Sequence, residues 1–89
     1  MKRFTKAPNE VLPYRFDWSL VLGEGETITS STWTVGEGLT EGAASADDTT
    51  TTITLSGGTL GTLYAVANTI VTSAGLTHER SVRLSIAAR

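Results

Sequence analysis

The stretch that decides the fold is LYAVANTIVTSAGLTHERSVRLSI, residues 63–86. Its first part, residues 63–72, is apolar on both phases of a strand, which predicts a central strand covered on two sides. The tripeptide SAG then predicts a tight turn, and residues 78–86 alternate apolar with polar side chains. This alternation predicts a strand with one buried face. The residues expected to face inward are Val82, Leu84 and Ile86.

Two more strands are expected upstream of this pair. Residues 14–20, YRFDWSL, alternate apolar with polar side chains, which places three aromatic rings on one face. The apolar positions of this stretch are Tyr14, Phe16, Trp18 and Leu20. In TITSSTWTV, Ile28 lies on the even phase but Trp33 and Val35 lie on the odd phase. The second strand therefore needs a bulge near residues 30–31.

The middle of the chain combines a polar segment with a threonine-rich strand. Residues 36–48, GEGLTEGAASADD, predict a mobile loop with at most a short extended piece at Leu39. Residues 49–55, TTTTITL, predict a strand, because β-branched side chains suit the pleated sheet. Its inward residues are expected to be Thr51, Ile53 and Leu55.

These strands and their glycine-rich turns predict an all-β fold, an immunoglobulin-like antiparallel β-sandwich of about six to seven strands. A small closed barrel is the alternative. In GTLYAVA, Tyr64 follows a glycine-rich turn, as in the tyrosine corner whose hydroxyl bonds to the turn backbone. It could instead be a core aromatic with a solvated hydroxyl. The aromatic residues expected in the core are Tyr14, Phe16, Trp18, Trp33 and Tyr64.

Length and composition limit the remaining possibilities. Eighty-nine residues predict one domain with a small core, so contacts with neighbouring subunits are expected to contribute to stability. The chain has no cysteine, one histidine and no calcium-loop spacing, so we expect neither a disulfide nor a bound metal or other cofactor. The first ten residues lack the apolar stretch of a signal peptide, and no segment is apolar enough to predict a membrane span.

Charge is unevenly distributed along the chain. Residues 1–16 sum to +3, residues 17–79 to −8 and residues 80–89 to +3. This pattern is either an ordinary solvated surface or a body and tails of opposite sign that attract one another between copies. An acidic body repels phosphates, so we do not expect nucleic acid as a partner.

Catalysis is not expected. The single histidine, His78, is predicted to be a solvated residue at a hairpin turn, with no nucleophile in reach. Asp47 and Asp48 are adjacent on a predicted loop, which does not hold two carboxylates at a fixed separation. The glycine-rich runs lack the Lys-Ser/Thr ending of a phosphate loop.

Several stretches resemble small immunoglobulin-like proteins of tailed bacteriophages, which act as fibre-to-tail adaptors or neighbouring virion proteins. The stretches are KAPNEVLPYRFDWSLVL, GETITSSTW, GLT and LSGGTLGTLYAVANTIVTSAGLTHERSVRLSI. The matching positions are Lys6, Pro8, Tyr14, Asp17, Trp18, Gly61, Tyr64, Thr72, Ser73, Gly75, Arg80 and Ser81. Ala7 and Pro13 depart from the family pattern. The resemblance implies a non-catalytic structural role at the tail, the neck or the fibre attachment site.

The same resemblance implies a location and partners. It points to a virion protein that is made and assembled in the bacterial cytoplasm, contacts other virion proteins and is present in several copies of a symmetric assembly. One alternative is a capsid or tail decoration domain that binds host surface glycans, and another is a bacterial adhesin repeat. The expected loops contain no aromatic residue for a glycan platform, which favours assembly.

The lead-in is interpreted as an extended N-terminal arm, residues 1–13, ahead of a sandwich domain, residues 14–89. Pro8 and Pro13 predict that the arm stays extended and outside the sheet. It is either a frayed terminus or a segment that docks on another virion protein. The residues expected to make that contact are Lys2, Arg3, Phe4, Lys6, Val11 and Leu12.

Overall fold

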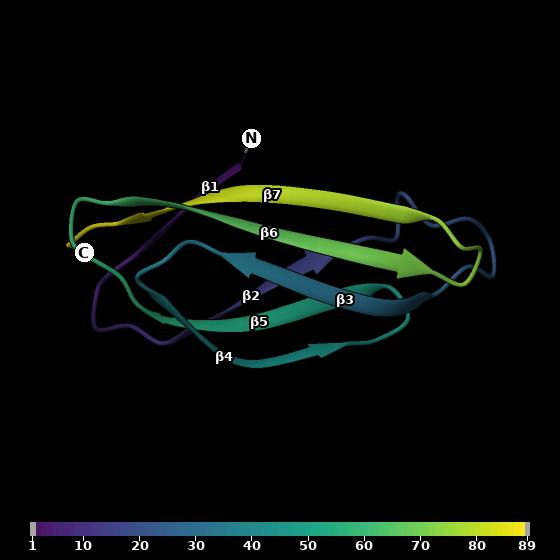
Figure 1. The fold of residues 1–89 in the computed structure, drawn as a ribbon, viewed down its shortest axis with the longest axis horizontal. Coiled ribbons are helices and arrows are strands. Elements are labelled where there is room, and N and C mark those ends of the chain that lie inside the picture. The colour runs from purple at the N-terminus through teal and green to yellow at the C-terminus, as the bar shows by residue number, and fades with distance from the viewer. Residues whose placement is uncertain (1, 89) are drawn as a thin grey trace.

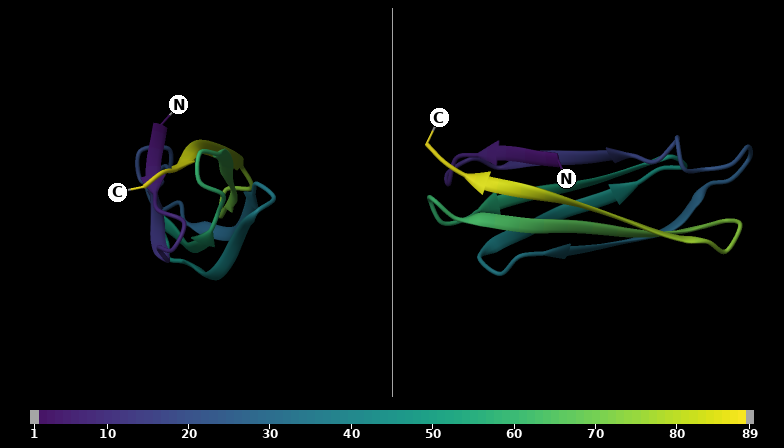
Figure 2. Two further views of the ribbon diagram at one scale, coloured as in Figure 1. Left: turned by 90° about the vertical axis from the view of Figure 1, so that its left-hand side faces the viewer. Right: turned by 90° about the horizontal axis from the view of Figure 1, so that it is seen from above.

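A computed structural model describes residues 2–88, apart from the side chain of Lys2, and contains seven strands in that range. The strands are β1 (Lys2–Lys6), β2 (Leu12–Asp17), β3 (Ile28–Val35), β4 (Leu39–Ala46), β5 (Thr50–Gly57), β6 (Leu63–Thr72) and β7 (Thr77–Ile86). They form a four-stranded sheet, β1-β7-β6-β3, and a three-stranded sheet, β2-β5-β4 (Figure 1). The two sheets face each other across one core (Figure 2). The predicted all-β sandwich is confirmed.

The first strand contradicts the expectation that the lead-in stays outside the sheet. β1 pairs with β7 in parallel, from Lys2 beside Val82 to Lys6 beside Ile86. Pro8 lies outside β1 and does not interrupt its hydrogen bonds, whereas Pro13 lies within the edge strand β2, opposite Thr54 of β5. Pro8 occupies the second position of a turn closed by the Glu10 N–H and the Ala7 carbonyl oxygen, 3.1 Å apart, and this position favours proline. The sandwich is therefore mixed and not purely antiparallel.

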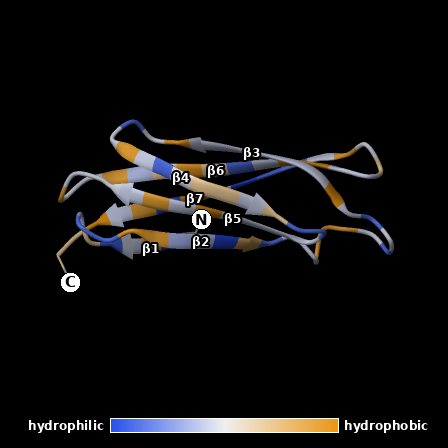
Figure 3. Ribbon diagram, turned by 90° about the horizontal axis from the view of Figure 1, so that it is seen from below, coloured by the Kyte–Doolittle hydropathy of each residue, from blue (hydrophilic) through white to orange (hydrophobic). Residues whose placement is uncertain are grey.

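The core forms where the inner faces of β2, β5, β6 and β7 meet. Its buried apolar residues are Phe16, Trp18, Ile53, Leu55, Tyr64, Val66, Ile70, Val82, Leu84 and Ile86. The inward faces predicted for β5 and β7 are confirmed. β6 is central in its sheet, but its exposure alternates along the strand, so the predicted cover on both faces is wrong. Figure 3 shows the alternation of apolar and hydrophilic residues.

Strands β3 and β4 occupy the middle of the chain, where the sequence predicts a bulge and a loop. The expected irregularity in β3 is confirmed, because its register against β6 shifts between Ile28 and Ser30. The loop expected over residues 36–48 is wrong, because β4 pairs antiparallel with β5 across most of that range. β4 is an edge strand whose residues are exposed after Leu39. Because the sequence of β4 is polar and rich in glycine and alanine, its side-chain pattern does not predict a strand. Pairing with β5 holds it in the sheet.

β2 ends earlier than the aromatic alternation suggests. The strand stops at Asp17, and the Val21 and Leu22 N–H groups both donate to the Trp18 carbonyl oxygen in the turn that follows. This turn leaves Leu20 97% exposed, so its expected place on the inner face is wrong. Leu22 packs against the core instead.

The sandwich is elongated, with extents of 42 × 24 × 20 Å, and its loops gather at two ends (Figure 1). We call one end the hairpin end, because it contains the β6–β7 hairpin together with residues 18–27 and 47–49. The other end contains residues 7–11, 36–38 and 58–62, and we call it the Pro8 end. The two ends lie on opposite sides of the core.

Candidate protein-binding site

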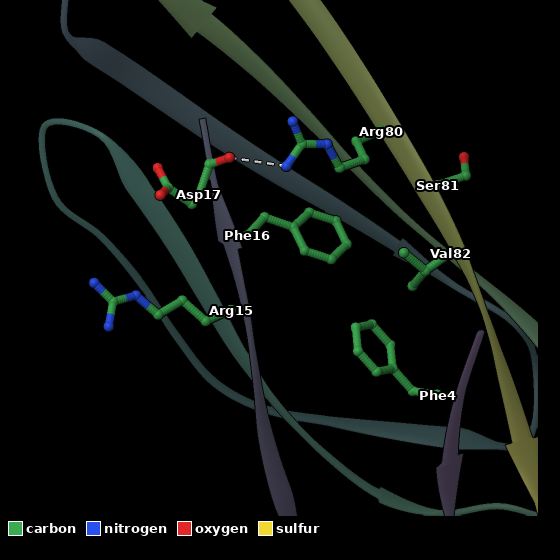
Figure 4. Close-up of a pocket in the computed structure, with 7 residues that line it drawn as sticks. All are labelled: Phe4, Arg15, Phe16, Asp17, Arg80, Ser81 and Val82. Carbon is green, nitrogen blue, oxygen red and sulfur yellow. Dashed lines mark hydrogen bonds between the residues drawn. The ribbon is translucent and has the colours of Figure 1, made fainter. Parts of the chain in front are cut away.

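A pocket opens at the seam between the two sheets, beside the point where β1 begins (Figure 4). Its volume is about 450 Å³. The residues that line it come from β1, β2 and β7: Phe4, Arg15, Phe16, Asp17, Arg80, Ser81 and Val82. It exists because β1 has five residues and β7 has ten, so β1 covers only part of the seam.

An aromatic cluster extends from this pocket into the core. The ring centres of Phe16 and Trp33 lie 5.1 Å apart, and those of Phe16 and Trp18 lie 6.4 Å apart in an edge-on arrangement. Tyr14 packs on Phe4 at 5.5 Å. Phe16, Trp18 and the Tyr64 side chain are buried, whereas Tyr14 and Trp33 are partly buried against the core. The inner wall of the pocket is therefore apolar and continuous with the aromatic part of the core.

Arg80 closes one side of the pocket. Its guanidinium carbon lies 4.4 Å from the centre of the Trp18 ring and 5.8 Å from that of Phe16, which is cation–π geometry. Its Nη1 donates a 2.9 Å hydrogen bond to the backbone carbonyl oxygen of Asp17. Arg80 thereby links β7 of one sheet to the end of β2 of the other.

Asp17 carries the one carboxylate that lines the pocket. Its Oδ1 accepts a 2.9 Å hydrogen bond from the Ser19 N–H. Hydrogen bonds from Ser19, helped by the nearby Arg15 and Arg80 charges, hold the pKa of Asp17 below its usual range. The carboxylate is thus engaged with its own turn, while the exposed Arg15 side chain stands on the rim.

Beneath the pocket, a buried polar network joins the two sheets. The Trp18 Nε1–H donates to Thr51 Oγ1 at 3.0 Å and to Asn68 Oδ1 at 3.2 Å. The Thr51 hydroxyl donates to Asn68 Oδ1 at 2.7 Å, and the Asn68 amide donates to Ser31 Oγ and to the Thr32 carbonyl oxygen. Asn68 has no exposed surface. The network links β3, β5, β6 and the turn after β2 in a chain that has no cysteine to cross-link its sheets.

The Lys6 side chain lies inside the molecule. It has no exposed surface, and its Nζ donates to the carbonyl oxygens of Gly57 at 2.6 Å and Ala7 at 2.8 Å. The Glu10 carboxylate accepts the Ala7 N–H at 2.8 Å and completes the turn after β1. Lys6 and the turn at Pro8 therefore form a closed corner at the Pro8 end. The Lys6 ammonium is buried there and is not accessible to a partner.

The other residues of the predicted arm differ in accessibility. Arg3 is exposed on β1, and Val11 is 64% exposed in the connection to β2. Phe4 packs against the core and lines the pocket, while Leu12 is half-buried at the start of β2. Met1 and the side chain of Lys2 lie outside the described part of the chain.

Tyr64 shows the geometry of a tyrosine corner. Its hydroxyl oxygen accepts a 2.9 Å hydrogen bond from the Thr59 N–H, five residues upstream in the glycine-rich turn. Hydrogen bonds from Thr59 hold the pKa of Tyr64 below its usual value. Gly38 packs on the ring with a φ of +109°, and a Cβ there would lie 2.9 Å from the hydroxyl oxygen. Both glycine-rich turns at this end are thus shaped around Tyr64.

His78 is not the solvated turn residue that the sequence predicts. It lies within β7 and is half-buried, and its Nε2 is shielded from solvent with no hydrogen-bond partner among the described residues. The Thr72 hydroxyl, the Gly23 N–H and the nearby His78 hold the pKa of Glu26 below its usual range.

Within residues 2–88, no group of three or more His, Cys, Asp or Glu side chains is placed to hold a metal ion.

Exposed apolar side chains occupy both ends of the sandwich. The hairpin end carries Leu20, Val21 and Leu76, and the Pro8 end carries Val11, Leu60 and Leu63. The exposed acidic residues near the hairpin end are Asp17, Glu24, Asp47, Asp48 and Glu79. One end is therefore apolar and acidic, while the other is apolar with less charge. Residues 2–88 contain no helix that is long and apolar enough to cross a membrane.

Comparison with known proteins gives one family. The model described as "Podophage GP4 fiber-tail adaptor protein gp77" matches residues 6–85. A comparison with curated proteins gave no match. Sequence reasoning found the aromatic residues of this region but missed Asn68, the burial of Lys6 and the stacking of Arg80. Each is a polar residue with at least one partner distant in the sequence. The positions of Lys6 and Arg80 within the resemblance were the available signals.

Proposed function

The chain belongs to the podophage GP4 fiber-tail adaptor family, and we propose on that premise that it joins a fibre to the tail of a podophage virion. The family supports a structural role in the virion and contacts with other virion proteins. In this proposal the chain acts through protein–protein contacts alone and catalyses no reaction. The family match across residues 6–85 is the observation that carries the proposal.

The shape of the domain supports an adaptor with two partners. An adaptor must bind different proteins at separate surfaces, and this domain carries exposed apolar residues at both ends of a 42 Å body. Exposed apolar groups with polar surroundings are typical of protein interfaces. We assign one end to the tail and the other to the fibre. The acidic hairpin end fits a partner with basic side chains around an apolar centre.

The N-terminal residues contribute to the Pro8 end in this proposal. Val11 belongs to the apolar group at that end, and Leu12 lies next to it at the start of β2. Arg3 presents its charge from the edge of the sheet. Lys6 supports this end from inside through its bond to Gly57. Several copies are expected to assemble in the host cytoplasm around the symmetric tail.

The test is complementation of a phage that lacks this gene, with fibres counted by electron microscopy and the adaptor quantified in purified virions. Leu20→Asp with Leu76→Asp alters one end, and Val11→Asp with Leu60→Asp alters the other. Thr32→Asp with Thr34→Asp places the same two charges on exposed positions of β3 and serves as the control. We expect one pair to remove the adaptor from the tail and the other to leave the adaptor in place without fibres. Wild-type protein absent from virions, or normal fibre numbers with both pairs, would refute the adaptor function.

A further inference from the structure

The edge of β7 is incompletely paired on the side of β1. Strand β1 covers residues 82–86 of β7, and no other described residue pairs with residues 77–81 on that side. An unpaired strand edge presents a row of backbone donors and acceptors, which is a template for an added strand. The free part of the edge continues in line with β1.

The pocket lies directly beside this free edge. Phe4, Phe16 and Val82 provide apolar surface, and Ser81 marks the junction with the edge of β7. The volume of about 450 Å³ is within the usual range for ligand pockets. An extended segment alternates its side chains, so a strand laid on residues 77–81 would direct alternate side chains into this pocket.

The charged groups around the pocket favour an acidic residue in the incoming segment. The lining includes two arginines, Arg15 and Arg80, and one acidic residue, Asp17, and the Arg15 guanidinium extends outward on the β2 side (Figure 4). The Asp17 carboxylate already accepts the Ser19 N–H. A guanidinium has five N–H donors in a planar fork that suits a carboxylate, and Arg15 stands exposed on the rim.

We propose that this seam binds an extended segment of a neighbouring virion protein, which adds a strand to residues 77–81 of β7 end to end with β1. The segment places an apolar side chain in the pocket and a carboxylate on Arg15. The proposal rests on the adaptor function and assigns a surface to one of its protein contacts. This contact region lies at the side of the sandwich and adjoins the hairpin end, with which it shares Asp17 and Glu79.

The first experiment uses the absence of cysteine in the chain. Ser81→Cys introduces one thiol at the pocket, and Thr32→Cys introduces one on the exposed face of β3. Each variant is labelled with a maleimide as free protein and in purified virions. We expect the Ser81→Cys thiol to react at least about tenfold more slowly in virions, while the Thr32→Cys thiol shows that the reagent has access. Equal rates for the Ser81→Cys thiol in free protein and in virions would overturn the proposal.

Two further measurements separate strand addition from simple coverage. Amide hydrogen exchange of residues 77–81 should slow in the assembled particle, because an added strand bonds to the backbone. Arg15→Glu should lower the amount of adaptor or fibre per virion several-fold, whereas Arg83→Glu makes the same charge change on an exposed position of β7 and should have little effect. If wild-type protein enters virions but exchange is unchanged and Arg15→Glu assembles normally, this inference fails while the adaptor function stands. If wild-type protein never enters virions, the adaptor function fails first.

Discussion

The Lys6 ammonium donates a 2.6 Å hydrogen bond to the carbonyl oxygen of Gly57, and this bond ties the end of β1 to the end of β5. The two strands belong to different sheets, so Lys6 joins the halves of the sandwich at the Pro8 end. Lysine is rarely buried unless its charge is paired or hydrogen-bonded. Here backbone carbonyl oxygens accept the ammonium protons.

Lys6→Met should therefore destabilise the domain. Methionine fills a similar volume but cannot donate, so the Gly57 carbonyl oxygen loses this donor, whereas the Ala7 carbonyl oxygen still accepts the Glu10 N–H. We expect the free energy of unfolding to fall by about 1–3 kcal/mol, the cost of leaving a buried acceptor unsatisfied. Urea denaturation followed by tryptophan fluorescence measures it. Arg3→Met, at an exposed position of the same strand, is the control and should change stability by less than about 0.5 kcal/mol. Equal effects of the two substitutions would contradict the structural role of Lys6.

Thr51 and Asn68 should show strong energetic coupling. Both contact the Trp18 indole and each other, so removing one weakens the bonds of the other. Asn68→Leu should cost about 2–3 kcal/mol, because it leaves the Thr32 carbonyl oxygen without its donor. A double-mutant cycle with Thr51→Val should give a coupling energy of at least about 0.5 kcal/mol. Additive losses would show that the three side chains act independently.

Tyr64→Phe removes the hydroxyl that accepts the Thr59 N–H and keeps the ring in place. We expect the melting temperature to fall by about 4–8 °C, which is the effect of losing about one net hydrogen bond in a domain of this size. Differential scanning calorimetry measures this shift. An unchanged melting temperature would mean that the tyrosine corner contributes packing alone.

Asp47 should make the free energy of unfolding depend on pH. The Thr50 hydroxyl and the Thr49 and Thr50 N–H groups hold its pKa below the usual range, so the folded state binds the proton less readily than the unfolded state. Its contribution to stability is therefore present above the ordinary aspartate pKa and is lost as pH falls through the lowered folded-state pKa. The stability difference between wild type and Asp47→Asn should be largest near neutral pH and shrink below about pH 4.

Thermal melts between neutral pH and pH 2 measure this difference. Asp48→Asn removes the neighbouring charge and leaves the N–H contacts of Asp47 in place, so it controls for net charge at this turn. A difference between Asp47→Asn and wild type that persists unchanged into acid would rule out a role for the carboxylate.

The strands that the sequence predicts correctly have a side-chain pattern that is visible within the strand itself. β5 and β7 have β-branched or alternating apolar residues, and β3 shows its bulge as a change of phase. β1 and β4 were missed because they are edge strands with polar or small residues, and their partners supply the backbone bonds that hold them.

The candidate site was only partly accessible from sequence. Phe16 and Trp18 were expected in the core, but the pocket beside them exists because β1 is shorter than β7. That arrangement depends on the pairing of β1 with β7, which no local sequence pattern predicts. The burial of Asn68 and Lys6 likewise depends on acceptors that come close only in the folded chain.

The parallel pairing of β1 with β7 joins the first described strand to the last. This pair has the largest sequence separation among the described strand pairs, and the edge that β1 joins belongs to the hairpin of β6 and β7. On the ribosome, β1 has no partner until β7 has emerged, and β2 to β6 can assemble in the meantime. The strand of this domain that is synthesised first therefore gains its partner last.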